Sequence, residues 1–106
     1  MLVIDILVNS AGIFRMGKAT ELDPETWTQV LAINLNGTFF ASQAVLPDLL
    51  ERGGNIVNLS SNAGLYGQAY NAAYCASKGG VIQLTRAGRG KLVAPGKGTW
   101  RQQGLD

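Results

Sequence analysis

Two short apolar runs, residues 3–9 and 55–61, stand far apart in the sequence and constrain the fold more than any other feature. Both are rich in Val, Ile and Leu, and their length is typical of strands buried within a sheet. Because the segment between them is long and has helical patterns, the two strands are expected to lie parallel, joined by a crossover. With a further helix after the second run, the sequence predicts a βαβα unit of the α/β class.

Helix signals divide the segments between and after these strands. Asp23-Pro24-Glu25 is typical of a helix start, with an acidic N-cap, a proline at the first helical position and a glutamate near the positive end of the dipole. A second helical stretch is expected from about Thr38 to Arg52, where Gly53-Gly54 ends it. The last helix is predicted over about 69–86, and its many small residues favour close packing.

Tyr74 and Lys78 lie one helical turn apart on that last helix, so their side chains are expected on the same face. A free phenol has a pKa of about 10, and a nearby cation lowers the pKa of such a group. The pair is therefore a candidate device for proton transfer. The spacing alone is weak evidence, because a core aromatic residue followed by a solvated lysine produces the same pattern.

Three further segments accompany this pair in a fixed order. Asn9-Ser10-Ala11-Gly12 follows the first strand, Asn34-Leu35-Asn36-Gly37 lies inside the long helical run, and Ser60-Ser61-Asn62-Ala63-Gly64 leaves the second strand. In order and separation, these segments resemble the middle of a short-chain dehydrogenase/reductase. The resemblance runs from about residue 3 to residue 87. It implies that residues 1–87 form the central part of a Rossmann-type domain, with a partial, doubly wound parallel sheet.

The resemblance also implies a function, namely hydride transfer between a nicotinamide cofactor, NAD or NADP, and an alcohol or carbonyl substrate. The implied catalytic residues are Asn34, Ser61, Tyr74 and Lys78. Ser61 would orient the substrate oxygen, Tyr74 would exchange its proton, and Lys78 would act on the phenol and hold the nicotinamide ribose. Asn34 would anchor a water that links Lys78 to solvent. Asn9 matches a turn near the adenosine side, so the implied cofactor-binding residues are Asn9, Tyr74 and Lys78.

Simpler interpretations of several residues stay open. Asn34 is also consistent with a polar break in a kinked helix, and Asn9 with an amide that ties neighbouring backbone together. Ser10 departs from the second asparagine that the family carries in this turn, but it keeps a short polar side chain. Ser60 is expected to point away from Ser61, because neighbouring strand residues face opposite sides of a sheet.

The composition argues against several other classes of function. The net charge of +2 is small and the nine Lys and Arg residues form no basic run, so neither nucleic acid nor a membrane surface is indicated as a partner. Cys75 is the single cysteine and histidine is absent, so neither an internal disulfide nor a metal site is expected. No apolar stretch reaches the roughly 20 residues that span a bilayer. The start lacks the pattern of a signal peptide, so a cytoplasmic protein is expected.

The chain departs from the family pattern at both ends. The glycine-rich turn that holds a dinucleotide pyrophosphate would precede Val3, and the sequence carries no such turn there. Residues 88–106 predict an irregular tail, because Gly88-Arg89-Gly90-Lys91 breaks the helical pattern and residues 96–104 predict no packed element. A frameshift near residue 88 is one hypothesis for this tail. Two alternative functions stay open: an inactive truncated fragment that cannot bind dinucleotide, and a small module that associates through its helices.

Unpaired sheet edges and a thin core predict that copies of the chain associate with one another. The expected contact surfaces are the helix that carries Phe39-Phe40 and the small-residue helix that carries Tyr74, because members of the resembled family build oligomers from these helices. Phe39-Phe40 is interpreted as core or interface packing, and Gly79-Gly80 as a place of tight helix packing. The expected protein is a homo-oligomer that acts on a small-molecule alcohol or carbonyl.

Overall fold

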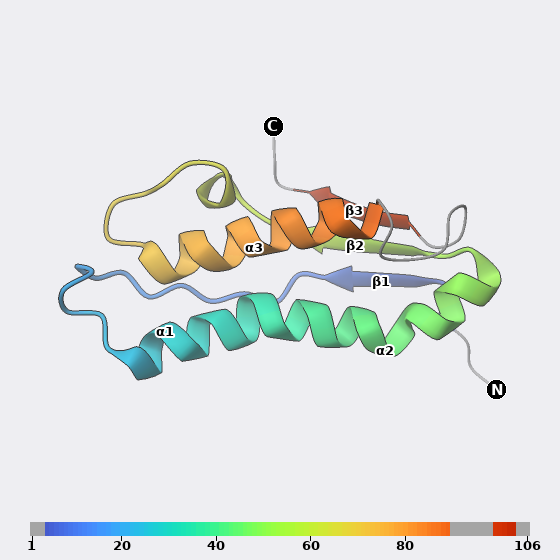
Figure 1. Cartoon of the computed structure of the whole chain (residues 1–106), viewed down its shortest axis with the longest axis horizontal. Helices are drawn as coiled ribbons and strands as arrows, with labels where there is room; N and C mark the ends of the chain where they lie inside the picture. Colours follow the sequence, from blue (N-terminus) through green and yellow to red (C-terminus); the bar gives the residue numbers. More distant parts are fainter. Residues whose placement is uncertain (1–3, 90–98, 104–106) are drawn as a thin grey trace.

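A computed structural model describes residues 4–89 and 99–103. They form a three-stranded sheet in the order β1-β2-β3, where β1 is Ile6–Asn9, β2 is Asn55–Leu59 and β3 is Thr99–Gln103. Both strand pairs are parallel. Figure 1 shows the three strands side by side, with long helices running along the sheet. The α/β fold with a parallel sheet, as a partial Rossmann-type unit, is therefore confirmed.

The third strand corrects the prediction for the end of the chain. The sequence predicts no packed element over residues 96–104, yet Thr99–Gln103 pairs with every residue of β2. The prediction was wrong because it weighed only the local pattern. Without a neighbour on that side, β2 would be an edge strand with unpaired backbone donors and acceptors. A parallel strand satisfies these groups whatever its side chains are. Residues 90–98 and 104–106 of the predicted tail lie outside the described residues.

One long helical rod connects β1 to β2. It consists of α1 (Pro24–Leu31), the π-helical turn η1 (Ala32–Asn36) and α2 (Gly37–Arg52). The predicted start is confirmed, because Asp23 Oδ1 accepts a hydrogen bond from the Thr26 N–H at 2.7 Å. This backbone donor is the main cause that lowers the pKa of Asp23.

Two shorter segments complete the fold after β2. The 3₁₀ turn η2 (Asn62–Gly64) leads to α3 (Ala72–Arg89), which begins later and ends later than the sequence predicts. The expected break at Gly88 does not occur, because the helix continues through Arg89. Tight packing at Gly80 is confirmed, since a Cβ atom placed there would lie 2.8 Å from a methyl group of Leu35.

The hydrophobic core lies between α2, α3 and one face of the sheet. Val45, Leu49 and Ile56 form its buried centre, and Leu7, Leu46 and Leu84 pack around them. The two outward-facing residues of β1, Ile6 and Val8, are exposed. Within residues 4–89 and 99–103, each helix is too short or too polar to cross a membrane.

The aromatic pair on α2 does not belong to this core. Phe40 is 60% exposed, and its ring makes an edge contact with the partly buried Phe39 at 5.7 Å between centroids. Core packing was therefore the wrong interpretation for Phe40, because its position on the rod turns it away from the sheet. A role in an interface stays a prediction.

Candidate active site

Asn34 lies in the π-helical turn η1 and is fully buried. Its Oδ1 accepts the Ile13 N–H at 2.8 Å, and its Nδ2 donates to Ile13 O at 2.7 Å and to Ser77 Oγ at 3.0 Å. Single π-helical turns are frequent at functional sites, because the extra residue re-aims side chains within the helix. This asparagine therefore joins three segments: the chain after β1, the helical rod and α3.

Lys78 is a cation in an almost closed environment, with 6% of its surface exposed. Its Nζ donates to Leu59 O at 3.3 Å and lies 5.8 Å from the centre of the Tyr74 ring. Burial lowers the pKa of the Lys78 ammonium, because a low-dielectric environment disfavours the charged form. The predicted proximity of the tyrosine and lysine side chains is thus present.

Gly12 makes room for this amine. A Cβ atom at Gly12 would lie 3.3 Å from Lys78 Nζ and 3.5 Å from Asn34 Oδ1. The turn after β1 therefore approaches both predicted catalytic side chains closely. A Cβ atom at this position would press on the amine, which would have to shift by a few tenths of an ångström.

Tyr74 is half-buried at the start of α3, and the ring of Phe14 meets it edge-on at 5.9 Å and 70°. Phe14 itself is 57% exposed. The Tyr74 ring thus has two neighbours: the buried Lys78 amine, 5.8 Å from its centre, and the exposed ring of Phe14.

Ser61 does not end a strand, because β2 stops at Leu59. Its Oγ accepts the Ala63 N–H at 3.0 Å and caps the turn η2. The described residues show no hydrogen bond between Ser61 and Tyr74. Ser60 Oγ donates to Lys78 O at 3.1 Å and fastens the turn to α3. Neither serine belongs to the strand, so the alternation argument loses its premise, and the expectation that the two side chains point apart stays a prediction.

Asn9, the last residue of β1, belongs to a second cluster of polar side chains. Its Nδ2 donates to Asn58 Oδ1 at 2.8 Å and to Ser42 Oγ at 3.2 Å, and Asn58 Nδ2 donates to Thr85 Oγ1 at 3.0 Å. The amide therefore ties two strands and α2 together through side chains, where the simpler interpretation had expected backbone partners. A cofactor role for Asn9 stays a prediction.

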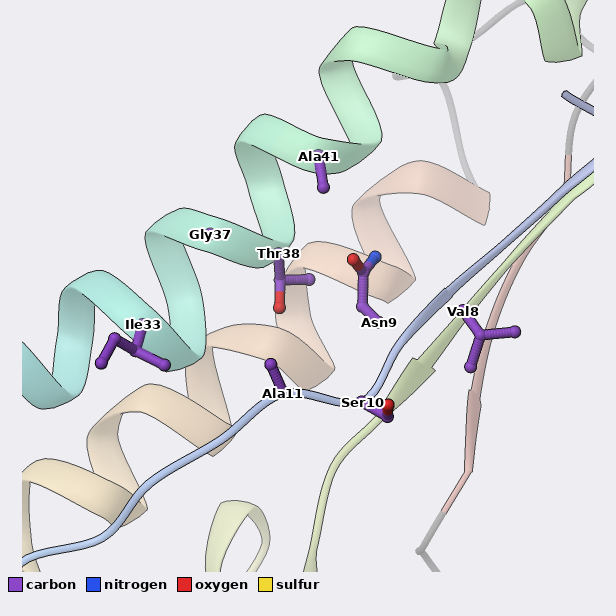
Figure 2. A pocket seen from close by; sticks show the side chains of 8 residues that line it. All are labelled: Val8, Asn9, Ser10, Ala11, Ile33, Gly37, Thr38 and Ala41. Carbon is purple, nitrogen blue, oxygen red and sulfur yellow. The ribbon is translucent and has the colours of Figure 1, made fainter. Parts of the chain in front are cut away.

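A pocket of about 320 Å³ opens beside Asn9, at the end of β1. Figure 2 shows its lining side chains between the strand end and the helical rod, with Asn9 directed toward the helices and Val8 toward the opposite face of the sheet. The lining residues are Val8, Asn9, Ser10, Ala11, Ile33, Gly37, Thr38 and Ala41. In open parallel sheets, ligands bind outside the carboxyl ends of the strands, which is where this pocket lies.

Comparison with known proteins agrees with this arrangement. The profile of the family described as short chain dehydrogenase matches residues 1–95. The chain belongs to this family. A 2-(S)-hydroxypropyl-CoM dehydrogenase of Xanthobacter autotrophicus is 46% identical over 100 residues, which cover 85% of this chain and 39% of the relative.

Two further relatives come from other organisms. A D-threitol dehydrogenase of Mycolicibacterium smegmatis is 50% identical over 84 residues, covering 78% of this chain and 32% of the relative. A 3-oxoacyl-(acyl-carrier-protein) reductase of Thermotoga maritima is 43% identical over 103 residues, covering 88% of this chain and 42% of the relative. The chain thus spans about a third to two fifths of the length of these relatives.

Three residues with a part in the candidate site were missed in the sequence. Gly12 ends the turn after β1, Ser77 lies three residues after Tyr74, and Asn58 shares the inward face of β2 with Ile56. Asn58 carried a readable signal, because an amide on the buried face of a strand needs a partner. Gly12 and Ser77 carried none, since their importance depends on contacts between segments far apart in the sequence.

Proposed function

We propose that this chain carries the catalytic centre of an NAD(P)-dependent oxidoreductase that interconverts an alcohol and a carbonyl compound. The observation that carries the proposal is the buried Lys78 ammonium beside the Tyr74 ring, with Asn34 fixed nearby. A charged amine is costly to bury. Its burial next to a phenol and a half-open surface is typical of an acid/base site.

The residues present fit a nicotinamide cofactor in two respects. An ammonium has three donors, and among the described residues Lys78 donates one hydrogen bond, so donors remain for the hydroxyl groups of a ribose. The pocket at the end of β1 offers Asn9, Ser10 and Thr38 as polar lining for another part of the dinucleotide. When bound, the nicotinamide would supply or accept the hydride.

The side chains of this chain would perform the remaining steps. Tyr74 would give a proton to the substrate oxygen during reduction and remove it during oxidation. The Lys78 amine would stand beside the phenol during this transfer. Ser61 would donate a hydrogen bond to the same oxygen, where negative charge grows in the transition state. Asn34 would keep the turn after β1 against the amine and anchor a water that links Lys78 to solvent.

The substrate class is proposed to be a small alcohol or carbonyl compound. The named activities of the relatives include dehydrogenases of 2-(S)-hydroxypropyl-CoM and D-threitol, both of which are alcohols by name. The exposed Phe14 at the phenol gives the substrate an aromatic neighbour. Assembly into a homo-oligomer and a place in the cytoplasm belong to the same proposal.

Calorimetry with NADH and with NADPH on the 106-residue chain tests the function directly. Binding in the micromolar range to either dinucleotide would support the oxidoreductase. Absence of binding at millimolar concentrations of both would contradict it for this chain and favour the inactive fragment. Size-exclusion chromatography of the same sample tests assembly, because a stable, well-folded monomer would contradict the oligomer.

A further inference from the structure

Ser77 connects the predicted catalytic residues, although its own hydroxyl faces no solvent. It is fully buried on α3, between Tyr74 and Lys78 in the sequence. Its Oγ donates to Tyr74 O at 2.8 Å and accepts from Asn34 Nδ2 at 3.0 Å. A hydroxyl has one proton, so donation to the carbonyl leaves the lone pairs for Asn34 and fixes the direction of both hydrogen bonds.

The same hydrogen bonds extend to the turn that covers the amine. Asn34 is joined to both backbone groups of Ile13, and the preceding residue, Gly12, packs against Lys78 Nζ. A closed series of contacts therefore runs from Ser77 on α3 to Asn34 in η1, then to the turn after β1, and from this turn back to the Lys78 amine on α3. Loss of its oxygen would leave a buried Asn34 N–H without a partner, and water would be drawn between the two helices.

We propose that Ser77 is a positioning residue whose hydroxyl holds η1 and the turn after β1 against α3, so that bulk water, as distinct from the single water that Asn34 would anchor, stays away from Lys78. This inference rests on the proposed function only for its consequence on turnover. The contacts themselves do not depend on it.

Ser42 provides a matched control, since it is also a fully buried helix serine. Its Oγ donates to Thr38 O at 2.7 Å and accepts from Asn9 Nδ2 at 3.2 Å. Ser42→Ala thus removes the same two kinds of hydrogen bond as Ser77→Ala, at a hydroxyl that bonds to Asn9 and not to Asn34. A purely structural serine would behave alike at both positions.

The test is an NMR titration of the Lys78 side chain in the native chain and in both alanine variants, with the resonance identified by its loss in Lys78→Met. In Ser77→Ala we expect the midpoint to move up toward that of an ordinary lysine by about half a pH unit or more, because water reaches the amine. In Ser42→Ala we expect no movement. Ser77→Thr keeps a hydroxyl and should restore the native midpoint.

Equal midpoints in Ser77→Ala and Ser42→Ala would overturn the proposal. If Ser77→Ala does not fold, Ser77→Cys against Ser42→Cys decides in its place, because a thiol fills the site but is a weak hydrogen-bonding group. An upward shift confined to Ser77→Cys supports the role, and equal midpoints overturn it.

Turnover separates this inference from the proposed function. Where the native chain reduces a carbonyl compound, Ser77→Ala should lower kcat about tenfold with KM nearly unchanged, as expected when the reacting groups are misplaced. A native chain without activity would count against the proposed function alone, because the Lys78 midpoint is measured without cofactor or substrate.

Discussion

Two buried polar clusters in this chain use the same chemistry for different ends. The scaffold cluster comprises Asn9, Ser42, Asn58 and Thr85, and the site cluster comprises Asn34, Ser77 and Lys78 with the backbone of Ile13. In each, an asparagine amide donates to a hydroxyl on a helix, and that hydroxyl donates to a helix carbonyl. The second cluster differs because it encloses a charge.

The site cluster is expected to be less stabilising than the scaffold cluster, because it contains a buried cation with few partners. In the scaffold cluster every group is neutral, and the Ser42 and Thr85 protons go to Thr38 O and Val81 O at 2.7 and 2.8 Å. In the site cluster the Lys78 ammonium has a single carbonyl partner at 3.3 Å among the described residues. A satisfied neutral cluster stabilises, whereas a buried cation with few partners costs stability. Proteins retain such groups chiefly where function needs them.

The largest expected effect is on turnover and concerns Tyr74, the tyrosine beside the site cluster. Tyr74→Phe removes the proposed proton donor and should lower kcat by about 10²–10⁴-fold. The free energy of unfolding of this variant should change by less than about 0.5 kcal/mol, because the Tyr74 hydroxyl has no hydrogen-bond partner among the described residues. Steady-state kinetics and urea unfolding measure the two quantities. Tyr66→Phe is the control, since Tyr66 is 68% exposed. Equal turnover in both variants would end the catalytic assignment of Tyr74.

The largest stability effect belongs to the scaffold cluster. Asn58→Ala removes the acceptor of Asn9 and the donor to Thr85 in a fully buried place, and should cost about 2 kcal/mol. Asn55→Ala on the same strand is the control, because that side chain is only partly buried. Urea unfolding followed by circular dichroism compares the two. A loss at Asn58 no larger than at Asn55 would mean that the cluster does not hold the strands together.

The scaffold was easier to predict than the site for a physical reason. Buried strands and helix starts depend on neighbours in the sequence, so the apolar run that contains β1 and the cap at Asp23 were readable. The tyrosine and lysine were also readable, since one helical turn fixes their distance. The hydrogen bond between Asn34 and Ser77 joins residues 43 positions apart, and no local pattern encodes it.

The wrong predictions share one cause, which is that tertiary partners override local pattern. β3 forms from Thr99–Gln103 because β2 offers it an open edge, although its own residues suggest no strand. β2 ends at Leu59, where the sequence predicted a strand through residue 61, because Ser60 bonds to α3 and Ser61 caps the turn η2. The π-helical turn at Ala32–Asn36 was visible only as a bend, since its extra residue depends on how the rod packs.

The two clusters should also respond to substitution with opposite changes in the free energy of unfolding: a loss at Asn58 and a smaller gain at Lys78. Lys78→Met removes the buried charge but keeps an unbranched apolar stem, and should raise the free energy of unfolding near neutral pH by about 1 kcal/mol while activity is lost. The folded-state pKa of Lys78 lies below its ordinary value of 10.5, so the unfolded chain binds more protons between these two values. Native stability should therefore rise as pH increases through this window.

The Lys78→Met variant should lack that rise, which urea unfolding at several alkaline pH values can measure. The scaffold cluster contains no such group, so Asn58→Ala should lower the curve and keep its slope. A variant at Lys78 that is less stable than the native chain would show that the amine is better satisfied than its single short-range partner suggests.

The smallest expected effect lies outside both clusters, at the start of α1. The Thr26 N–H lowers the pKa of Asp23 below 3.8, so the stabilisation it gives is present above that value and is lost as pH falls through the lower, folded-state pKa. Asp23→Asn keeps a capping oxygen but cannot titrate there, and should flatten the acid side of the stability curve. Asp23→Ala should flatten it too and lower the melting temperature at neutral pH as well. Thermal melts between about pH 2 and 6 separate these outcomes. Unchanged acid dependence in both variants would place the acid sensitivity of the fold elsewhere. Because Asp23 is an exposed cap with no part in the proposed site, turnover should not respond to either change.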